Sequence, residues 1–289
     1  MIFSPEEYSL NTDQALLTQE LNKILKEAEE LQTEENLKTI FSLLDLTSLK
    51  ETDNETGIKE LTEKVNQFPG HFPQLPEVAS ICIYPEWVHT VKKNLQRNEV
   101  GITSVTGGFP ASQTFIDVKS VETALAVKAG ASEIDMVISS GKFLDGDWNT
   151  VAQEIVQIKD ACQEKHLKVI LETGSLETPE NIKNASFLAM ESGADFIKTS
   201  TGKAKTGATP EAFLIMCKAV KIFHEKTGKK IGLKPAGGIS SAATALVYFA
   251  IVKNVLGNQW LNKNLFRIGA GNLANALLSS IENKNISYF

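Results

Sequence analysis

Two lysines stand at the ends of short apolar runs, where a charged side chain is costly to bury. Lys198 lies in FIKTSTGK and Lys234 lies in IGLKPAGG. Two ammonium groups that converge in a partly desolvated space should lower each other's pKa, and strand alternation puts Gly232 beside Lys234, which leaves room there. Because a neutral amine attacks carbonyl carbon, the pair predicts imine chemistry on Lys198. The alternative is that both lysines reach solvent from strand ends.

Two aspartates occupy comparable positions. Asp135 stands in EIDMVI and Asp45 in LLDLTSL. A carboxylate at the end of an apolar strand needs a partner, and the two lysines are natural ones. Formation of an imine and then an enamine moves protons, which a nearby carboxylate can carry. The alternative for each aspartate is a cap where a strand meets a loop.

Three glycine-rich segments suggest a site for an anion. They are residues 201–203 (TGK), 236–238 (AGG) and 269–272 (GAGN). The last two follow the seventh and eighth predicted strands, where α/β barrels often bind phosphate through backbone N–H groups and a helix N-terminus. Lys203 would add a positive charge. The alternative is that all three are ordinary turns.

Eight apolar runs alternate with helical segments along the chain. The runs are 40–45, 78–84, 101–106, 133–138, 167–172, 195–200, 231–235 and 265–269, and the clearest helices are 114–129, 150–165, 179–192, 209–226, 241–254 and 272–282. Strands joined by crossover helices are parallel, and eight such units predict a TIM (β/α)8 barrel. A doubly wound open sheet is the main alternative. Polar residues at many strand ends, and no GxGxxG after the first strand, favour the barrel.

The N-terminal part is expected to be an addition to this barrel. Residues 13–36 predict one helix, with Leu17, Leu21 and Ile24 on its apolar face. We therefore predict an N-terminal helical extension over 1–37 and the barrel domain over 38–289. Residues 68–76 (FPGHFPQLP) contain three prolines and predict an irregular connection.

Composition excludes several classes of function. The chain has 289 residues and a formal charge of −6, which argues against general binding of nucleic acid or anionic membranes. Cys82, Cys162 and Cys217 form no CxxC, and the four histidines show no metal-binding spacing. Without a signal peptide or a long apolar run, we expect a cytoplasmic protein with no metal site. Homo-oligomers are common, and the helix over 13–36 is a candidate contact.

Several motifs occur in the order found in one enzyme family. LLDLTSL, ICIYP, SVTGGFP, EIDMV, LETG, ADFIKTSTGK, LKPAGG and FRIGA together resemble deoxyribose-phosphate aldolases, from about residue 38 to residue 282. The resemblance implies a class I aldolase. It would cleave 2-deoxy-D-ribose 5-phosphate reversibly to D-glyceraldehyde 3-phosphate and acetaldehyde through a lysine Schiff base, without a cofactor.

The resemblance also assigns roles to residues. Lys198 would form the Schiff base, Lys234 would lower its pKa, and Asp135 would relay protons. The implied substrate-binding residues are Asp45, Thr47, Cys82, Gly202, Lys203, Gly237 and Gly238. From the glycine-rich segments and the positions beside them, Ser240, Gly269, Gly271 and Asn272 are further substrate-binding candidates. A lone cysteine in an apolar strand, such as Cys82, is more often a packing residue.

Two departures from the family pattern concern the phosphate end. Ser240 stands near the place where some members carry arginine after LKPAGG, and Gly271-Asn272 replace a common pair of hydroxyl residues. Both changes keep backbone donors, and the first removes one possible positive charge at the phosphate, so phosphate affinity is expected to be weaker or the acceptor range wider. A Schiff-base aldolase with a different or unphosphorylated acceptor is therefore a second hypothesis. A third is a catalytically silent sugar-phosphate-binding protein.

Overall fold

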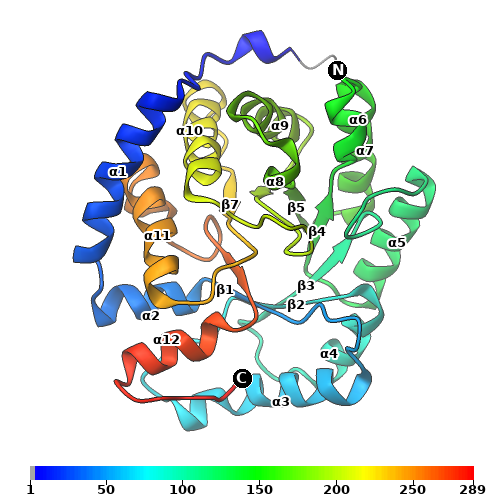
Figure 1. The fold of residues 1–289 in the computed structure, drawn as a ribbon. Coiled ribbons are helices and arrows are strands. Elements are labelled where there is room, and N and C mark those ends of the chain that lie inside the picture. Colours follow the sequence, from blue (N-terminus) through cyan, green and yellow to red (C-terminus); the bar gives the residue numbers. More distant parts are fainter. Residues whose placement is uncertain (1–3) are drawn as a thin grey trace.

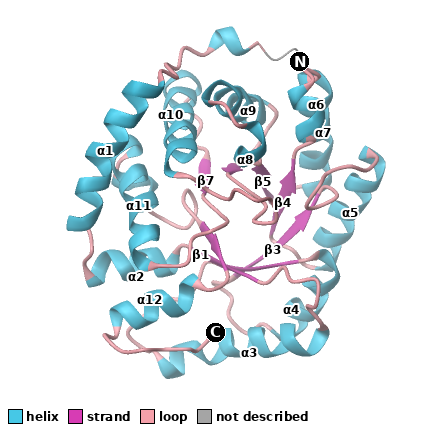
Figure 2. Ribbon diagram, viewed as in Figure 1, coloured by secondary structure: helices cyan, strands magenta, loops and turns pink. Residues whose placement is uncertain are grey.

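The protein folds around a central parallel sheet of eight strands. The computed structural model describes residues 4–289. The strands are β1 (Leu44–Thr47), β2 (Ser80–Ile83), β3 (Gly101–Thr106), β4 (Glu133–Val137), β5 (His166–Ile170), β6 (Phe196–Lys198), β7 (Gly232–Lys234) and β8 (Ile268–Ala270). Their order is β7-β6-β5-β4-β3-β2-β1-β8, and bridges Leu233–Phe266 and Ala236–Gly269 join the two ends. The predicted TIM barrel is thus confirmed (Figure 2).

Helices surround the strands on all sides (Figure 1). They are α1 (Gln14–Glu30), α2 (Glu34–Ser42), α3 (Glu55–His71), α4 (Val88–Asn94), α5 (Ile116–Ala129), α6 (Ser140–Leu144), α7 (Trp148–Cys162), α8 (Thr173–Leu176), α9 (Pro179–Glu191), α10 (Pro210–Thr227), α11 (Ala242–Leu256) and α12 (Leu273–Ile281), with 3-10 turns at Pro5–Glu7, Pro85–Trp87 and Asn258–Trp260. Threonine caps start α9 and α10, each followed by proline at the first helical position. None of the helices within residues 4–289 is long and apolar enough to cross a membrane.

The N-terminal part differs from its prediction in two respects. The expected single helix over 13–36 is interrupted after Glu30, and Thr33 caps a second helix, α2. The first predicted strand, 40–45, is wrong in its first half because α2 continues to Ser42. A short apolar run fits either a strand or a buried helix, and tertiary packing decides between them. The apolar face of α1 is buried on α10 and α11, along which α1 runs in Figure 1.

The segment rich in proline is partly helical. Helix α3 continues through Pro69 to His71, so the irregular connection begins later than expected. Proline removes one backbone donor from a helix and usually ends it. Here the ring of Phe68 packs against Phe41 and Phe72, with ring centroids 5.1 Å apart in both pairs. This aromatic packing holds the last turn in place.

Charged side chains fill much of the barrel interior, where TIM barrels usually carry bulky branched residues. The strand register aligns Asp135 of β4 with Lys168 of β5, and Lys198 of β6 with Lys234 of β7. These four side chains are buried. Their burial is tolerable only if each charge is paired, which the geometry of the site provides.

Candidate active site

The two lysines predicted to act together meet at one carboxylate. The Nζ atoms of Lys198 and Lys234 each lie 2.7 Å from Oδ2 of Asp135. Lys198 ends β6, Lys234 ends β7 and Asp135 lies within β4, so three strands bring these groups together. The arrangement places an amine within hydrogen-bond distance of a group that can take up its proton.

Asp45 joins the same cluster from β1. Its Oδ2 lies 2.5 Å from Nζ of Lys234, and its Oδ1 lies 2.6 Å from a guanidinium nitrogen of Arg267. Ser80 of β2 donates a hydrogen bond to the same Oδ1 atom at 2.7 Å. Asp45 is therefore a buried partner of Lys234, as expected of a carboxylate in an apolar run, although it lies within β1 and not at its end.

A second layer of charges lies beneath these groups, and sequence reasoning did not single it out. Lys168 Nζ lies 2.5 Å from Glu133 Oε2 and 3.1 Å from Asp135 Oδ1. A guanidinium nitrogen of Arg267 lies 2.6 Å from Oε1 of Glu133, and the hydroxyl of Thr103 donates a hydrogen bond to Oε2 of Glu133. The signal was present in the sequence. Lys168 is a lysine inside an apolar run, and Glu133 precedes Asp135 by two residues, which places both on one face of β4.

The carboxylates of the cluster are held ionised. Burial opposes the charged form of Asp135, but Lys168, Lys198 and Lys234 outweigh it and hold the pKa of Asp135 well below its ordinary value. The pKa of Asp45 is lowered in the same way, mainly by Lys234 and Arg267 against the effect of burial.

The expected lowering of the Lys234 pKa is not found. Burial disfavours its ammonium form, but Asp135 and Asp45 outweigh burial and raise the pKa of Lys234 above its ordinary value. The sequence shows two like charges converging, whereas the structure places carboxylates beside them. Lys234 is thus a stable cation, and its influence on Lys198 is that of a fixed positive charge.

A glycine makes room for Lys234, although it is not the expected one. A Cβ atom at Gly232 would lie 2.2 Å from the ring of Phe196, so the space there is filled by an aromatic side chain. A Cβ atom at Gly269 would lie 2.9 Å from Cε of Lys234. The glycine that leaves room for the lysine therefore comes from β8.

A pocket of about 360 Å³ opens at the carboxyl ends of the strands, and Lys198 lines it. Of the predicted site residues, Thr47, Gly202, Lys203, Gly237, Gly238, Ser240, Gly269, Gly271 and Asn272 also line this pocket. Asp45, Asp135, Lys234 and Cys82 do not line it and are fully buried. The structure thus separates the residues that line the pocket from a buried layer that does not.

The glycine-rich segments form one wall of the pocket. Gly237 has a φ of +86°, and a Cβ atom there would lie 3.2 Å from Cα of Gly202, so the two loops approach closely. Glu172, which follows β5, accepts a hydrogen bond from the hydroxyl of Thr201 and so supports the loop after β6. Backbone N–H groups in such turns form anion-binding concavities.

Two lysines lie toward the mouth of the pocket. Lys203 follows β6, and its Nζ lies 3.7 Å from Glu51 in the loop after β1. Lys50, from the same loop, also lines the pocket and was not predicted. Both are cations that an anionic substrate group can reach.

Cys82 belongs to a small apolar cluster. It packs with Leu49 and Val105, and Tyr84 and Phe109 border the cluster. Burial raises the pKa of the Cys82 thiol, so the side chain is neutral and apolar. This environment agrees with the alternative that Cys82 is a packing residue beside the pocket.

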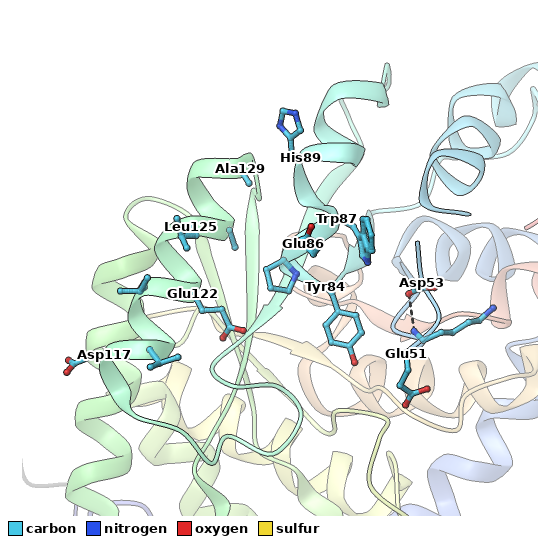
Figure 3. A pocket seen from close by; sticks show the side chains of 15 residues that line it. Glu51, Asp53, Tyr84, Glu86, Trp87, His89, Asp117, Glu122, Leu125 and Ala129 are labelled. Atoms are coloured by element: carbon cyan, nitrogen blue, oxygen red, sulfur yellow. Dashed lines mark hydrogen bonds between the residues drawn. The ribbon is translucent and has the colours of Figure 1, made fainter. Parts of the chain in front are cut away.

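A larger groove of about 1040 Å³ lies beside the pocket and does not include Lys198. Figure 3 shows Tyr84 and Trp87 on one side of it and Leu125 of α5 on the other. Its lining includes Lys50, Glu51 and Asp53, and the buried lysines and carboxylates at Lys198 are not among the residues that line it. Within residues 4–289, no group of three or more histidine, cysteine, aspartate or glutamate side chains is arranged to hold a metal ion.

Several known proteins are similar to this chain. A protein of Caenorhabditis elegans is 42% identical over 272 residues, which cover 93% of this chain and 89% of that protein. Human deoxyribose-phosphate aldolase is 40% identical over 279 residues, which cover 90% of this chain and 86% of the human protein. A crystal structure of deoxyribose phosphate aldolase from Aeropyrum pernix, described as tetrameric, superposes with a TM-score of 0.68 at 23% identity and covers 89% of this chain and 96% of that one.

The family described as DeoC/LacD family aldolase matches residues 39–255, which include β1 through β7 and most of α11. Lys198, Lys234, Asp135 and Asp45 all lie within the matched segment. The chain therefore belongs to the DeoC/LacD family of aldolases.

Proposed function

We propose that this protein is a class I aldolase that cleaves 2-deoxy-D-ribose 5-phosphate reversibly to D-glyceraldehyde 3-phosphate and acetaldehyde. The observation that carries the proposal is the position of Lys198. Its amine lies at the base of the pocket, 2.7 Å from Asp135, and the glycine-rich loops with Lys203 line the same pocket. An amine that attacks a carbonyl and a separate site for phosphate suit a sugar phosphate with an aldehyde at its other end.

In the proposed reaction the neutral amine of Lys198 attacks C1 of the open-chain sugar. The carbinolamine loses water and becomes a protonated imine. Removal of the proton from the C3 hydroxyl then breaks the C2–C3 bond, and its electrons move into the imine. Glyceraldehyde 3-phosphate leaves, and a two-carbon enamine stays on Lys198. Protonation at C2 and hydrolysis release acetaldehyde and restore the amine.

Asp135 is the group proposed to move protons at Lys198. Its Oδ2 atom is already hydrogen-bonded to the Lys198 amine, and Lys234 and Lys168 keep it ionised. A carboxylate in that state accepts a proton from the ammonium group and returns it, through water, to the carbinolamine oxygen. Lys234 stays charged throughout and stabilises the carboxylate.

Borohydride trapping tests the proposal directly. The protein is incubated with 2-deoxyribose 5-phosphate, reduced with borohydride and mapped by peptide mass analysis. We expect an adduct on Lys198 and none after Lys198→Ala. An adduct on Lys203 or Lys234 would keep the aldolase but change the nucleophile. With no adduct from any carbonyl compound, Schiff-base chemistry is excluded, and retained sugar-phosphate binding would then indicate the catalytically silent protein.

The phosphate end of the pocket favours one second candidate. Ser240 and Asn272 line it without charge, and Lys203 is partly engaged with Glu51. An aldolase that accepts a different or unphosphorylated aldehyde is consistent with so few cations. Initial rates with glyceraldehyde 3-phosphate, glyceraldehyde and short aliphatic aldehydes, with acetaldehyde as donor, decide between them. A preference for an unphosphorylated acceptor would contradict the deoxyribose-phosphate assignment.

The protein is further proposed to act in the cytoplasm as a homo-oligomer, with small sugar phosphates and aldehydes as its ligands. Cys82, Cys162 and Cys217 are all free and buried, as suits a reducing compartment. The support for self-association comes from α5. Its barrel side buries Lys119 and Thr123, whereas its outer side exposes apolar residues. Such an outer face is typical of a protein interface.

The oligomer has its own test. The exposed apolar side chains of α5 are Val118, Val121 and Leu125, each more than half exposed. We expect Val121→Glu to shift the mass measured by light scattering after size-exclusion chromatography toward the monomer. Leu144→Glu, at an exposed leucine on α6 outside this face, is the matched control and should leave the mass unchanged.

A further inference from the structure

Lys168 transfers no proton in the proposed reaction, yet it lies at the centre of the buried charges. Its side chain is fully buried, and its Nζ lies 2.5 Å from Glu133, 3.1 Å from Asp135 and 3.8 Å from Asp45. It does not line the pocket. Burial of the Lys168 ammonium group costs free energy, although a substrate in the pocket would not contact it.

The ion pairs of the barrel interior form one connected cluster. Within residues 4–289 its cations are Lys168, Lys198, Lys234 and Arg267, and its carboxylates are Asp45, Glu133 and Asp135. With every member ionised, four positive charges face three negative ones. A net charge buried in a low-dielectric interior is unfavourable, and loss of one proton removes it.

Only one cation of the cluster is placed to lose that proton. Lys234 contacts two carboxylates, Lys168 contacts three, and Arg267 contacts two. Lys198 contacts Asp135 alone and lines the pocket. Deprotonation of Lys198 therefore breaks the fewest ion pairs and leaves the cluster neutral.

We propose that Lys168 is a positioning residue, which supplies the surplus buried cation and so favours the neutral amine at Lys198. This inference rests on the proposed role of Lys198 as the nucleophile. Lys168 acts through Asp135, whose Oδ1 it contacts while Oδ2 faces the other two lysines. Without Lys168 the cluster would be balanced, and proton loss from Lys198 would create an uncompensated negative charge.

The charged and titratable groups around Lys198 come from every part of the site. They are Asp45 on β1, Cys82 on β2, Glu133 and Asp135 on β4, Lys168 on β5, Glu172 after β5, Lys203 after β6, Lys234 on β7, Arg267 before β8, and Lys50 and Glu51 in the loop after β1. Substitutions of Lys168, Glu133 and Arg267 change the charge without altering a group that lines the pocket.

The test is the pH dependence of kcat/KM, which reports ionisation in the free enzyme. Lys168→Met leaves equal numbers of cations and carboxylates in the cluster. The acid limb of the kcat/KM profile should therefore move to higher pH by about one unit or more, with activity recovered at alkaline pH. Adding Glu133→Gln removes one carboxylate and restores the surplus charge. The double variant should therefore return toward the wild-type profile. Lys168→Arg keeps the charge and should keep the profile.

Arg267→Met provides an independent variant if Lys168→Met does not fold. It removes a cation of the same cluster without touching Asp135 or Lys198, and it makes the same prediction. A merely structural role would lower the rate at every pH and leave the acid limb in place. That result, or a double variant that does not return toward wild type, would overturn the inference.

Reductive methylation separates this inference from the proposed function. Formaldehyde and cyanoborohydride label neutral amines whether or not the sugar phosphate is a substrate, and peptide mapping reads the rate at Lys198. We expect labelling of Lys198 to require higher pH in Lys168→Met than in the wild type. Equal pH dependence of Lys198 labelling in both proteins would contradict the proposed role of Lys168, even if turnover is observed. If labelling shows the expected shift but no turnover is observed, the proposed function is wrong and the proposed role of Lys168 is retained.

Discussion

Lys198 and Lys234 bind the same oxygen atom of Asp135, each at 2.7 Å, and differ in everything else around them. Lys234 has a second carboxylate, Asp45, and is sealed from the pocket. Among residues 4–289, Lys198 pairs with no second carboxylate, and it lines the pocket. Two lysines of equal chemistry are thus divided by their surroundings into a permanent cation and a candidate nucleophile.

Asp135→Asn should remove proton transfer while keeping the shape of the site. We expect kcat to fall by about 10²- to 10⁴-fold, the usual contribution of a positioned acid or base. Steady-state cleavage of 2-deoxyribose 5-phosphate measures this, with circular dichroism to show that the variant folds. Asp117→Asn, at an exposed position on α5, is the control and should be unaffected. A near-normal kcat in Asp135→Asn would show that Asp135 does not transfer protons in the reaction.

Lys203→Gln should weaken binding of the phosphate group without changing the chemical step. A hydrogen bond to a charged group contributes about 1.5–3 kcal/mol, so we expect KM for the sugar phosphate to rise at least about tenfold. The KM for unphosphorylated deoxyribose should stay the same. Lys205→Gln is the matched control, since Lys205 is exposed and does not line the pocket. Equal effects on both sugars would argue against a phosphate contact at Lys203.

The buried charges make stability depend on pH in a stated direction. The folded-state pKa of Asp135 lies below its ordinary value of 3.8, so its stabilisation is complete above 3.8 and is lost as pH falls further. The raised pKa of Lys234 acts oppositely, and its stabilisation is lost as pH rises beyond 10.5. Urea unfolding across this range should show lower unfolding free energies at both extremes. A constant value below pH 3.8 would contradict the ion-pair geometry.

Gly269→Ala should displace the side chain of Lys234, which packs closely against Gly269. The added methyl group would lie 2.9 Å from both Cε of Lys234 and Cβ of Ala236. Overpacking of this kind costs about 1–3 kcal/mol, and displacement of Lys234 should also lower kcat/KM. Thermal unfolding and initial rates measure the two effects. Gly70→Ala, where nothing lies within 4 Å of the added carbon, should be neutral or slightly stabilising.

Local pattern determined much of the fold and the reactive groups. Charged residues inside apolar runs identified Lys198, Lys234, Asp135 and Asp45, because burial of a charge is too costly without a purpose or a partner. The repeated alternation of apolar runs and helices predicted the barrel, because parallel strands require crossover connections. Both features depend only on residues that are close together in the sequence.

The division of roles among the charges was decided by tertiary structure alone. Arg267 and Asp45 are 222 residues apart and meet because the barrel closes β8 onto β1. Pairing of β4 with β5 brings Lys168 to Asp135, and the barrel as a whole sets carboxylates around Lys234, which reverses the pKa shift expected from two lysines considered alone. Electrostatic energies depend on distances between groups, and barrel closure sets those distances.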